Sequence, residues 1–191
     1  MSGNGYEKNK APGRSPQQAL RDSASEFLLT WVDGDGRVVR SDQGNDTVSE
    51  GQAYGMLIAA AVGDEQTFQK IWDWTRAHLM RGDRLLAWHW GNGAVVDSSP
   101  ASDADLDAAR ALTVAGTIFG RTDFAADGRI LAGQIMNKLT AMTVHGRILL
   151  LGPWPDQQGC RCAWANPAFP QMLPWPRTVP PPLRPACTEA R

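Results

Sequence analysis

The sequence has no long apolar run, no excess of either charge and no grouped metal-binding side chains. Its 19 Lys and Arg residues nearly balance 20 Asp and Glu residues over 191 positions, so the net charge is −1. Because the basic residues are scattered and form no stripe, nucleic acid is not an expected partner. No apolar run approaches the roughly 20 residues that cross a bilayer, and the first residues hold no hydrophobic core of a signal peptide. A membrane partner is therefore not expected either.

Cysteine is scarce, and its three copies, Cys160, Cys162 and Cys187, all lie in the last part of the chain. Their spacing matches neither a zinc-ligand pattern nor a common disulfide framework. The three histidines stand apart from one another, and none belongs to a His-Glu-x-x-His pattern. We therefore expect no metal site and no cofactor.

The length suits one ordinary domain with a buried core. We expect residues 1–14 to be disordered, residues 15–151 to be folded and residues 152–191 to form an irregular tail. Ten of the thirteen prolines lie from Gly152 onward, and proline breaks a helical ladder and restricts the residue before it. We interpret this tail as the product of a shifted reading frame, with a proline-rich binding tail as the alternative.

Five segments have the apolar spacing of helices, and short β excursions lie between and after them. In the first segment, Ser15 is the expected N-cap, Pro16 the first helical residue and Gln18 the partner that closes a capping box. The second and fourth segments are apolar nearly all round, whereas the third and fifth are amphipathic. Two concentric rings of helices would give this alternation, because inner helices touch neighbours on every side. We expect helices over residues 15–32, 49–62, from about 64, over 106–119 and over 124–142, and extended segments over 85–97 and 148–151.

Glu50 stands one step before the second of these segments, and two roles are open to it. The spacing Thr47-Val48-Ser49-Glu50 matches the Ser/Thr-x-x-Glu capping box, in which the carboxylate reaches back to the backbone of the threonine. The other role is that of a catalyst. The two are compatible if a hydroxyl of Thr47 or Ser49 caps the helix while the carboxylate of Glu50 turns into a groove.

Three aspartates, Asp103, Asp105 and Asp107, stand where the fourth predicted helix starts. Carboxylates at helix N-termini are stabilised by the helix dipole, but three are more than a cap requires. We expect Asp103 and Asp105 to point into a cleft together, beside Trp88 and Trp90, whose flat rings suit a sugar. Carboxylates beside exposed aromatics indicate carbohydrate chemistry, since glycoside hydrolysis needs an acid and a second carboxylate. Ordinary helix caps and core tryptophans are the alternative.

Three stretches together resemble family 8 of the glycoside hydrolases: "SEGQAYGM" from Ser49, "AWHW" from Ala87 and "ASDADLDAARAL" from Ala101. That family contains bacterial cellulases, chitosanases, lichenases and xylanases. The match departs from the family pattern at Ala108 and Thr113, which are packing positions. The resemblance identifies residues 15–151 as the N-terminal part of a family 8 catalytic domain.

The resemblance implies an all-α fold, an incomplete (α/α)6 barrel, with inversion at the anomeric carbon of a β-1,4-linked glucan. It implies that Glu50 is the general acid, that Asp103 is the second catalytic residue and that Asp105 supports it. Trp88, Trp90 and Tyr54 are the expected substrate-binding side chains. We expect Glu50 to sit in an apolar or carboxylate-rich pocket, which keeps an acid protonated.

The family's general base lies in a Tyr-Asp-Ala-x-Arg-like segment, and this sequence contains none. We therefore expect a chain that is poorly active alone, corresponding to the first half of such an enzyme. Chitosanase or xylanase activity is the alternative within the family, and a non-catalytic glycan-binding remnant is the alternative outside it. The resemblance also implies a polysaccharide partner and a secreted or periplasmic location.

Overall fold

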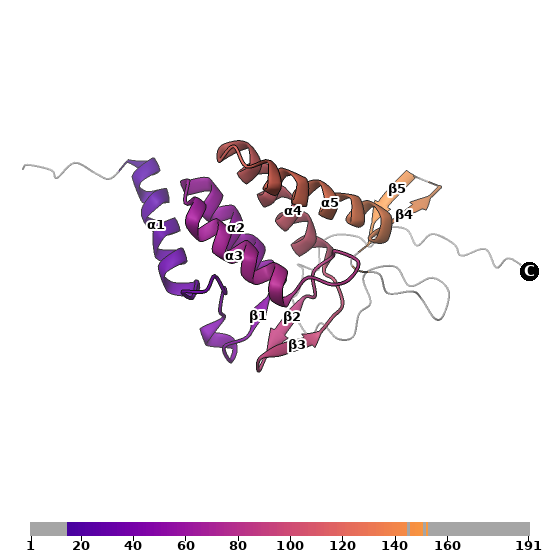
Figure 1. The fold of residues 1–191 in the computed structure, drawn as a ribbon, viewed down its shortest axis with the longest axis horizontal. Helices are drawn as coiled ribbons and strands as arrows, with labels where there is room; N and C mark the ends of the chain where they lie inside the picture. Colours follow the sequence, from indigo (N-terminus) through magenta and orange to yellow (C-terminus); the bar gives the residue numbers. More distant parts are fainter. Residues whose placement is uncertain (1–14, 145, 151, 153–191) are drawn as a thin grey trace, which may run out of the picture. The chain divides into compact units, whose positions relative to one another are not determined.

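The computed structural model describes residues 15–144, 146–150 and 152. The interpretations of residues 1–14 and 153–191, including the three cysteines, lie outside the described residues. The helices are α1 (Pro16–Trp31), η1 (Ser41–Gln43, a short 3-10 helix), α2 (Ser49–Val62), α3 (Glu65–His78), α4 (Ser102–Ile118) and α5 (Thr122–Lys138). The strands are β1 (Thr47–Val48), β2 (His89–Gly91), β3 (Ala94–Asp97), β4 (Thr140–Thr143) and β5 (Gly146–Leu149) (Figure 1). Five α-helices with short β excursions confirm the predicted fold class.

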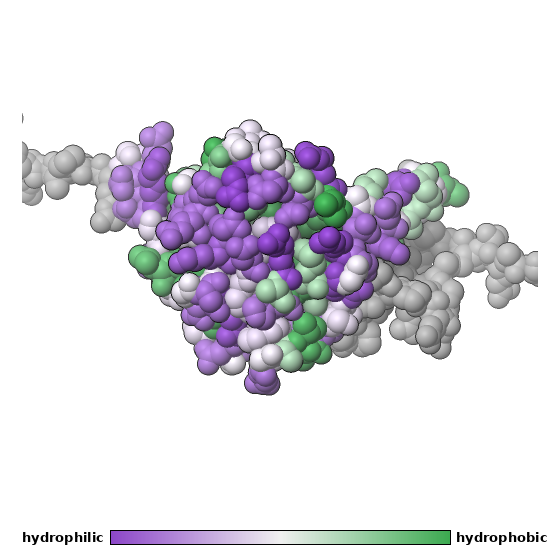
Figure 2. Space-filling view, viewed as in Figure 1, coloured by the Kyte–Doolittle hydropathy of each residue, from purple (hydrophilic) through white to green (hydrophobic). Residues whose placement is uncertain are grey.

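The helices pack in the order that the alternation predicts. Helix α2 lies against α4, while α3 packs on α2 and α5 packs on α4 (Figure 1). Side chains of the two amphipathic helices meet as well, since the rings of Phe68 and Phe124 are 4.8 Å apart. The core is built mainly from fully buried apolar side chains, among them Met56, Phe68, Ile71, Trp72, Leu112 and Phe124. The view in Figure 2 shows a mainly hydrophilic face with separate hydrophobic patches.

Helix α1 begins as predicted but packs loosely. The Ser15 hydroxyl accepts the backbone N–H of Gln18 at 3.1 Å, which confirms the N-cap. The capping box is wrong, because the Gln18 side chain donates to Asp22 at 2.8 Å. No residue of α1 is buried, and its apolar residue Leu20 is 67% exposed.

The predicted start of the fourth helix, the predicted end of the fifth helix and the predicted burial of the second helix are wrong. Helix α4 starts at Ser102 and not at residue 106, because Ser102 and Asp105 are buried and held by tertiary contacts. Helix α5 ends at Lys138, where the chain turns into the antiparallel pair β4 and β5. Helix α2 has the predicted bounds but is not buried all round, since Glu50 and Tyr54 are exposed.

Two glycines let α4 and α5 approach closely. A Cβ added to Gly116 would lie 2.8 Å from the Cβ of Ala125, and one added to Gly128 would lie 3.1 Å from the Cβ of Leu112. Gly128 therefore serves as a contact point between the helices, whereas its helix propensity alone marks it as a weak position.

A three-stranded antiparallel sheet, in the order β1-β2-β3, stands beside the start of α2. Thr47 pairs with Trp90 and Val48 pairs with His89. The connection between β2 and β3 has positive φ at Asn92 and Gly93, as an Asn-Gly hairpin turn requires. This turn separates β2 from β3 within the extended segment predicted over residues 85–97, and the sheet places the tryptophan segment beside Glu50.

Candidate active site

The start of α2 is held by strand pairing and has no side-chain cap. Val48 occupies the N-cap position and makes no capping hydrogen bond through its side chain. The Thr47 hydroxyl instead donates to the carbonyl oxygen of Val38 at 2.9 Å and accepts from Arg37 at 2.9 Å. The hypothesis that a hydroxyl of Thr47 or Ser49 caps α2 is therefore wrong, and the capping box does not form.

The carboxylate of Glu50 is engaged by the side chain one turn further along α2. The Tyr54 hydroxyl donates a hydrogen bond to Oε1 of Glu50 at 2.8 Å. That hydrogen bond, the Glu50 charge and burial raise the pKa of Tyr54 to about 12, and the charges of Asp107 and Asp103 add to the effect. The exposed face at the start of α2 thus lies within electrostatic reach of two carboxylates on α4.

The sequence predicted an apolar or carboxylate-rich pocket around Glu50, and in the structure this side chain is exposed. Glu50 is exposed among the residues that the structure describes, and Tyr54 is 44% exposed. The buried face of α2 carries Ala53 and Met56, which point into the core. The described contacts of the Glu50 carboxylate include the Tyr54 phenol, whose pKa the charges of Asp107 and Asp103 also raise.

Asp103 and Asp105 do not point into a common cleft. Both lie within the first turns of α4, and residues two apart on a helix face different directions. Asp103 is exposed, and its Oδ1 accepts the backbone N–H of Ala104 at 2.9 Å. Asp105 is completely buried. The prediction that the two carboxylates converge is wrong because the junction was expected to be a loop.

Asp105 connects α4 to the segment that leads to Trp88. Its Oδ1 accepts the backbone N–H of Leu86 at 3.0 Å, while Oδ2 has no partner among the described atoms. Burial raises the pKa of Asp105 to about 7, against the opposing hydrogen bond from Leu86. A fully buried side chain offers no surface to a sugar, so Asp105 fixes the position of its neighbours in this structure.

The two tryptophans that the sequence singled out have different environments. The Arg37 guanidinium lies 4.3 Å from the ring centroid of Trp90, and Trp74 meets the same ring edge-on at 5.4 Å. Trp90 thus packs against one cationic and one aromatic side chain within the fold. Trp88 lies 4.7 Å from the ring of His89 at a tilt of 30°. A hydrogen bond from the Trp88 side chain is the largest cause that lowers the pKa of Asp97.

Asp46 ties together the two segments that flank Glu50 and Trp88. Its Oδ2 is 3.0 Å from Nε2 of His89, and its Oδ1 accepts from Nε of Arg40 at 2.7 Å. Burial alone would raise the pKa of Asp46, but the hydrogen bonds and charges of Arg40 and His89 outweigh it and lower that pKa. Sequence reasoning missed Asp46 and the Tyr54–Glu50 contact. Only the second had a visible signal, the i,i+4 spacing on a predicted helix.

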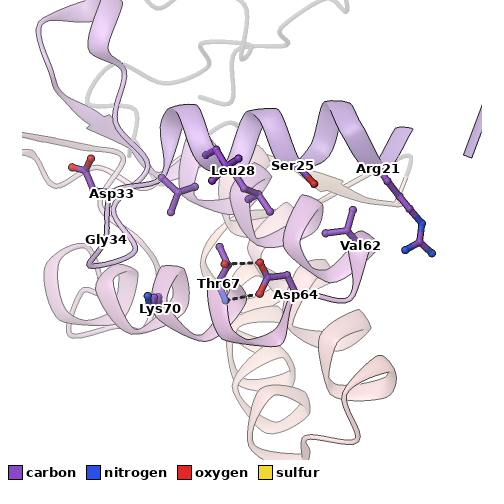
Figure 3. Close-up of a pocket in the computed structure, with 11 residues that line it drawn as sticks. Arg21, Ser25, Leu28, Asp33, Gly34, Val62, Asp64, Thr67 and Lys70 are labelled. Carbon is purple, nitrogen blue, oxygen red and sulfur yellow. Dashed lines mark hydrogen bonds between the residues drawn. The ribbon is translucent and has the colours of Figure 1, made fainter. Parts of the chain in front are cut away.

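A cavity of about 610 Å³ lies elsewhere, between α1 and the junction of α2 and α3. Figure 3 shows Arg21 and Leu28 of α1 facing Val62, Asp64 and the start of α3 across this space. Val62 is at the opposite end of α2 from Glu50, roughly 18 Å along the helix axis. This cavity is therefore separate from the carboxylate face.

Neither a grouped set of metal ligands nor a membrane-spanning helix occurs in the described part of the chain. No three His, Cys, Asp or Glu side chains in residues 15–144, 146–150 and 152 are grouped so that they could hold a metal ion. No helix among these residues is both long and apolar enough to cross a membrane.

Comparison with known proteins gives a consistent set of relatives. The model of the glycosyl hydrolases family 8 matches residues 16–171. A probable endoglucanase of Novacetimonas hansenii is 39% identical over 118 residues, which cover 60% of this chain and 34% of that protein. An endoglucanase of Pseudomonas fluorescens (strain SBW25) is 35% identical over 137 residues, covering 66% of this chain and 34% of that protein.

Solved structures share the fold over a similar region. An endo-β-1,4-glucanase from Acetobacter xylinum superposes with a TM-score of 0.68 at 34% identity, covering 72% of this chain and 44% of that chain. A cold-adapted family 8 xylanase in complex with substrate has a TM-score of 0.62 at 22% identity, covering 75% and 43%, which shows the fold alone. The neighbours are (α/α)6 barrels. The chain thus spans about a third of the length of the curated relatives and somewhat less than half of the solved ones.

Proposed function

This chain belongs to family 8 of the glycosyl hydrolases, and from that premise we propose that it carries the acid side of an active site that cleaves β-1,4-linked glucan. Glu50 is the general acid that protonates the leaving oxygen, and the bond is cleaved with inversion at the anomeric carbon. The observation that carries this proposal is the face where Glu50 and Tyr54 of α2 lie near Asp103 and Asp107 of α4.

Glucan is favoured as the substrate by the names of the relatives. The proteins above 30% identity to this chain are described as endoglucanases, including those of Novacetimonas hansenii and Pseudomonas fluorescens. The xylanase likeness is 22% identical and supports the fold alone. We therefore propose glucan as the substrate in preference to chitosan and xylan. Because such polysaccharides lie outside the cell, we also propose a secreted or periplasmic location, which cell fractionation would test.

The structure supports a distinct proposed role for each side chain. Asp103, which is exposed on the first turn of α4, is proposed to bind or orient the sugar at the cleavage point. Asp105 positions the backbone of Leu86 and does not itself contact sugar. Trp88 is proposed to stack on a neighbouring sugar ring. Trp90 is proposed to have a structural role, because the Arg37 guanidinium lies over its ring.

Inversion also requires a carboxylate that activates water, about 6.5 to 9.5 Å from the acid. The 191 residues contain no Tyr-Asp-Ala segment that would carry it. An added anion such as azide can replace the activated water in the test. Azide then forms a bond to the anomeric carbon from the face opposite the leaving group, the glycosidic bond breaks, and Glu50 gives its proton to the leaving oxygen.

The experiment incubates the chain with cellohexaose, with and without sodium azide, and detects reducing ends and glycosyl azide. We expect an α-glycosyl azide from the unaltered chain and none above background from Glu50→Gln. Binding of cellohexaose without product from either chain would favour a non-catalytic glycan-binding protein and overturn the enzyme proposal. Equal product from Glu50→Gln would remove Glu50 from the acid role.

A further inference from the structure

We propose that Tyr54 is a positioning residue that determines which oxygen of Glu50 carries the catalytic proton. The inference rests on the proposed function of Glu50 as general acid. The Tyr54 hydroxyl donates to Oε1 of Glu50 at 2.8 Å. In a protonated carboxyl group the carbonyl oxygen is the better acceptor and the other oxygen bears the proton. With Oε1 held as the acceptor, the proton lies on Oε2, the oxygen that is left to face the leaving group.

Tyr54 stays a donor over the whole range in which such an enzyme works. Its pKa is raised to about 12, first by the hydrogen bond to Glu50 and then by the charge of Glu50, by burial and by Asp107 and Asp103. A phenol that stays protonated near neutral pH keeps its O–H available as a donor to Glu50. The ionised carboxylate can only accept, so while Glu50 is charged the hydrogen bond runs from tyrosine to glutamate.

The backbone beneath the pair is fixed, so the hydrogen bond has a defined geometry. Glu50 and Tyr54 are four residues apart on α2 and therefore lie on one helix face. The core-facing side of α2 carries Ala53 and Met56, which are completely buried. Tyr54 itself is 44% exposed, so removal of its hydroxyl leaves the core unchanged. An effect of Tyr54→Phe on rate would thus act through Glu50.

A leaving-group comparison separates this role from substrate binding and from folding. The unaltered chain and Tyr54→Phe are assayed with azide on cellohexaose, whose leaving group needs a proton, and on 2,4-dinitrophenyl β-cellobioside, whose leaving group does not. We expect Tyr54→Phe to lower kcat on cellohexaose about tenfold or more with little change in KM, and to leave the aryl substrate within about twofold. Tyr6→Phe, which removes the same hydroxyl elsewhere in the chain, is the matched control.

Each other outcome has a defined meaning. Equal losses on the two substrates, a rise in KM on both, or no loss on cellohexaose would overturn the positioning role while leaving the proposed function intact. Turnover of neither substrate by the unaltered chain would overturn the proposed function together with this inference.

Discussion

The backbone N–H of Ser49 donates a hydrogen bond to the carbonyl oxygen of Trp88 at 2.9 Å. This contact joins the start of α2 to the segment that leads into β2. Together with the pairing of Val48 with His89, it holds Glu50 and Trp88 in neighbouring positions. Two motifs far apart in the sequence therefore lie side by side.

Tyr54 should lose much of its raised pKa when Glu50 loses its charge. The hydrogen bond to Glu50 and the Glu50 charge are the two largest causes that raise the pKa of Tyr54 to about 12. In Glu50→Gln we expect that pKa to fall toward the ordinary value of 10.0. The ¹³Cζ signal of Tyr54, followed by NMR through alkaline pH, measures it. Asp103→Asn should lower the pKa less, and a value near 12 in Glu50→Gln would contradict the hydrogen bond.

Asp105 should make the fold less stable as pH rises. Its pKa is raised from 3.8 to about 7 in the folded chain, so between those values the folded state binds more protons than the unfolded state. The free energy of unfolding then falls as pH rises from about 4 to about 7, by on the order of 4 kcal/mol. Asp105→Asn cannot ionise and keeps an oxygen for the Leu86 N–H. Its free energy of unfolding should depend less on pH.

Urea unfolding at a series of pH values measures that difference. Asp73→Asn, at an exposed position on α3, is the matched control and should follow the pH dependence of the unaltered chain. Parallel curves for Asp105→Asn and the unaltered chain would show that the buried carboxyl does not titrate as argued.

Substitution of Trp88 should weaken ligand binding, whereas substitution of Trp90 should lower the stability of the fold. Trp90 lies against Arg37 and Trp74, so Trp90→Ala should lower the free energy of unfolding by about 3 kcal/mol. Trp88→Ala should lower the affinity for cellohexaose about tenfold, the loss of one stacking contact. Calorimetric titration and urea unfolding of both variants provide the measurements, and the reverse pattern would refute the assignment.

Gly116 and Gly133 should respond oppositely to the same substitution. Both lie in helices, but a Cβ at Gly116 would be 2.8 Å from the Cβ of Ala125, whereas a Cβ at Gly133 meets nothing within 4 Å. Gly133→Ala should raise the free energy of unfolding by up to about 1 kcal/mol through helix propensity. Gly116→Ala should lower it by about 1 to 3 kcal/mol, because α4 and α5 must move apart. Thermal unfolding of the two variants measures these changes. Stabilisation by both substitutions would contradict the close packing of α4 against α5.

Local signals in the sequence predicted the helices well. Ser15 followed by Pro16 marked the start of α1, and the apolar run after Ser49 gave both ends of α2. The alternation of apolar and amphipathic segments predicted that α2 and α4 would pack together with α3 and α5 outside them. Each of these signals depends on residues within one segment, which is why sequence alone contained them.

Features that depend on distant partners were not predictable in this way. The aspartate-rich start of α4 has poor helix propensity, and it is helical because Asp105 is buried and bonded to Leu86. A two-residue strand such as β1 carries no periodic signal, so its pairing with Trp90 and His89 was invisible. The role of Gly128 depended on Leu112 of another helix. Sequence reasoning therefore singled out Glu50 and Asp103 as candidates but missed the tertiary contacts around them.

The most direct test of the central claim is the Glu50 dependence of glycosyl azide formation from cellohexaose. If Glu50 is the general acid of an inverting site, the unaltered chain with azide should yield the α-azide, and Glu50→Gln should reduce its yield by at least about a hundredfold. NMR of the product assigns the anomeric configuration. A β-azide would contradict inversion, and a yield unchanged in Glu50→Gln would contradict the role of Glu50.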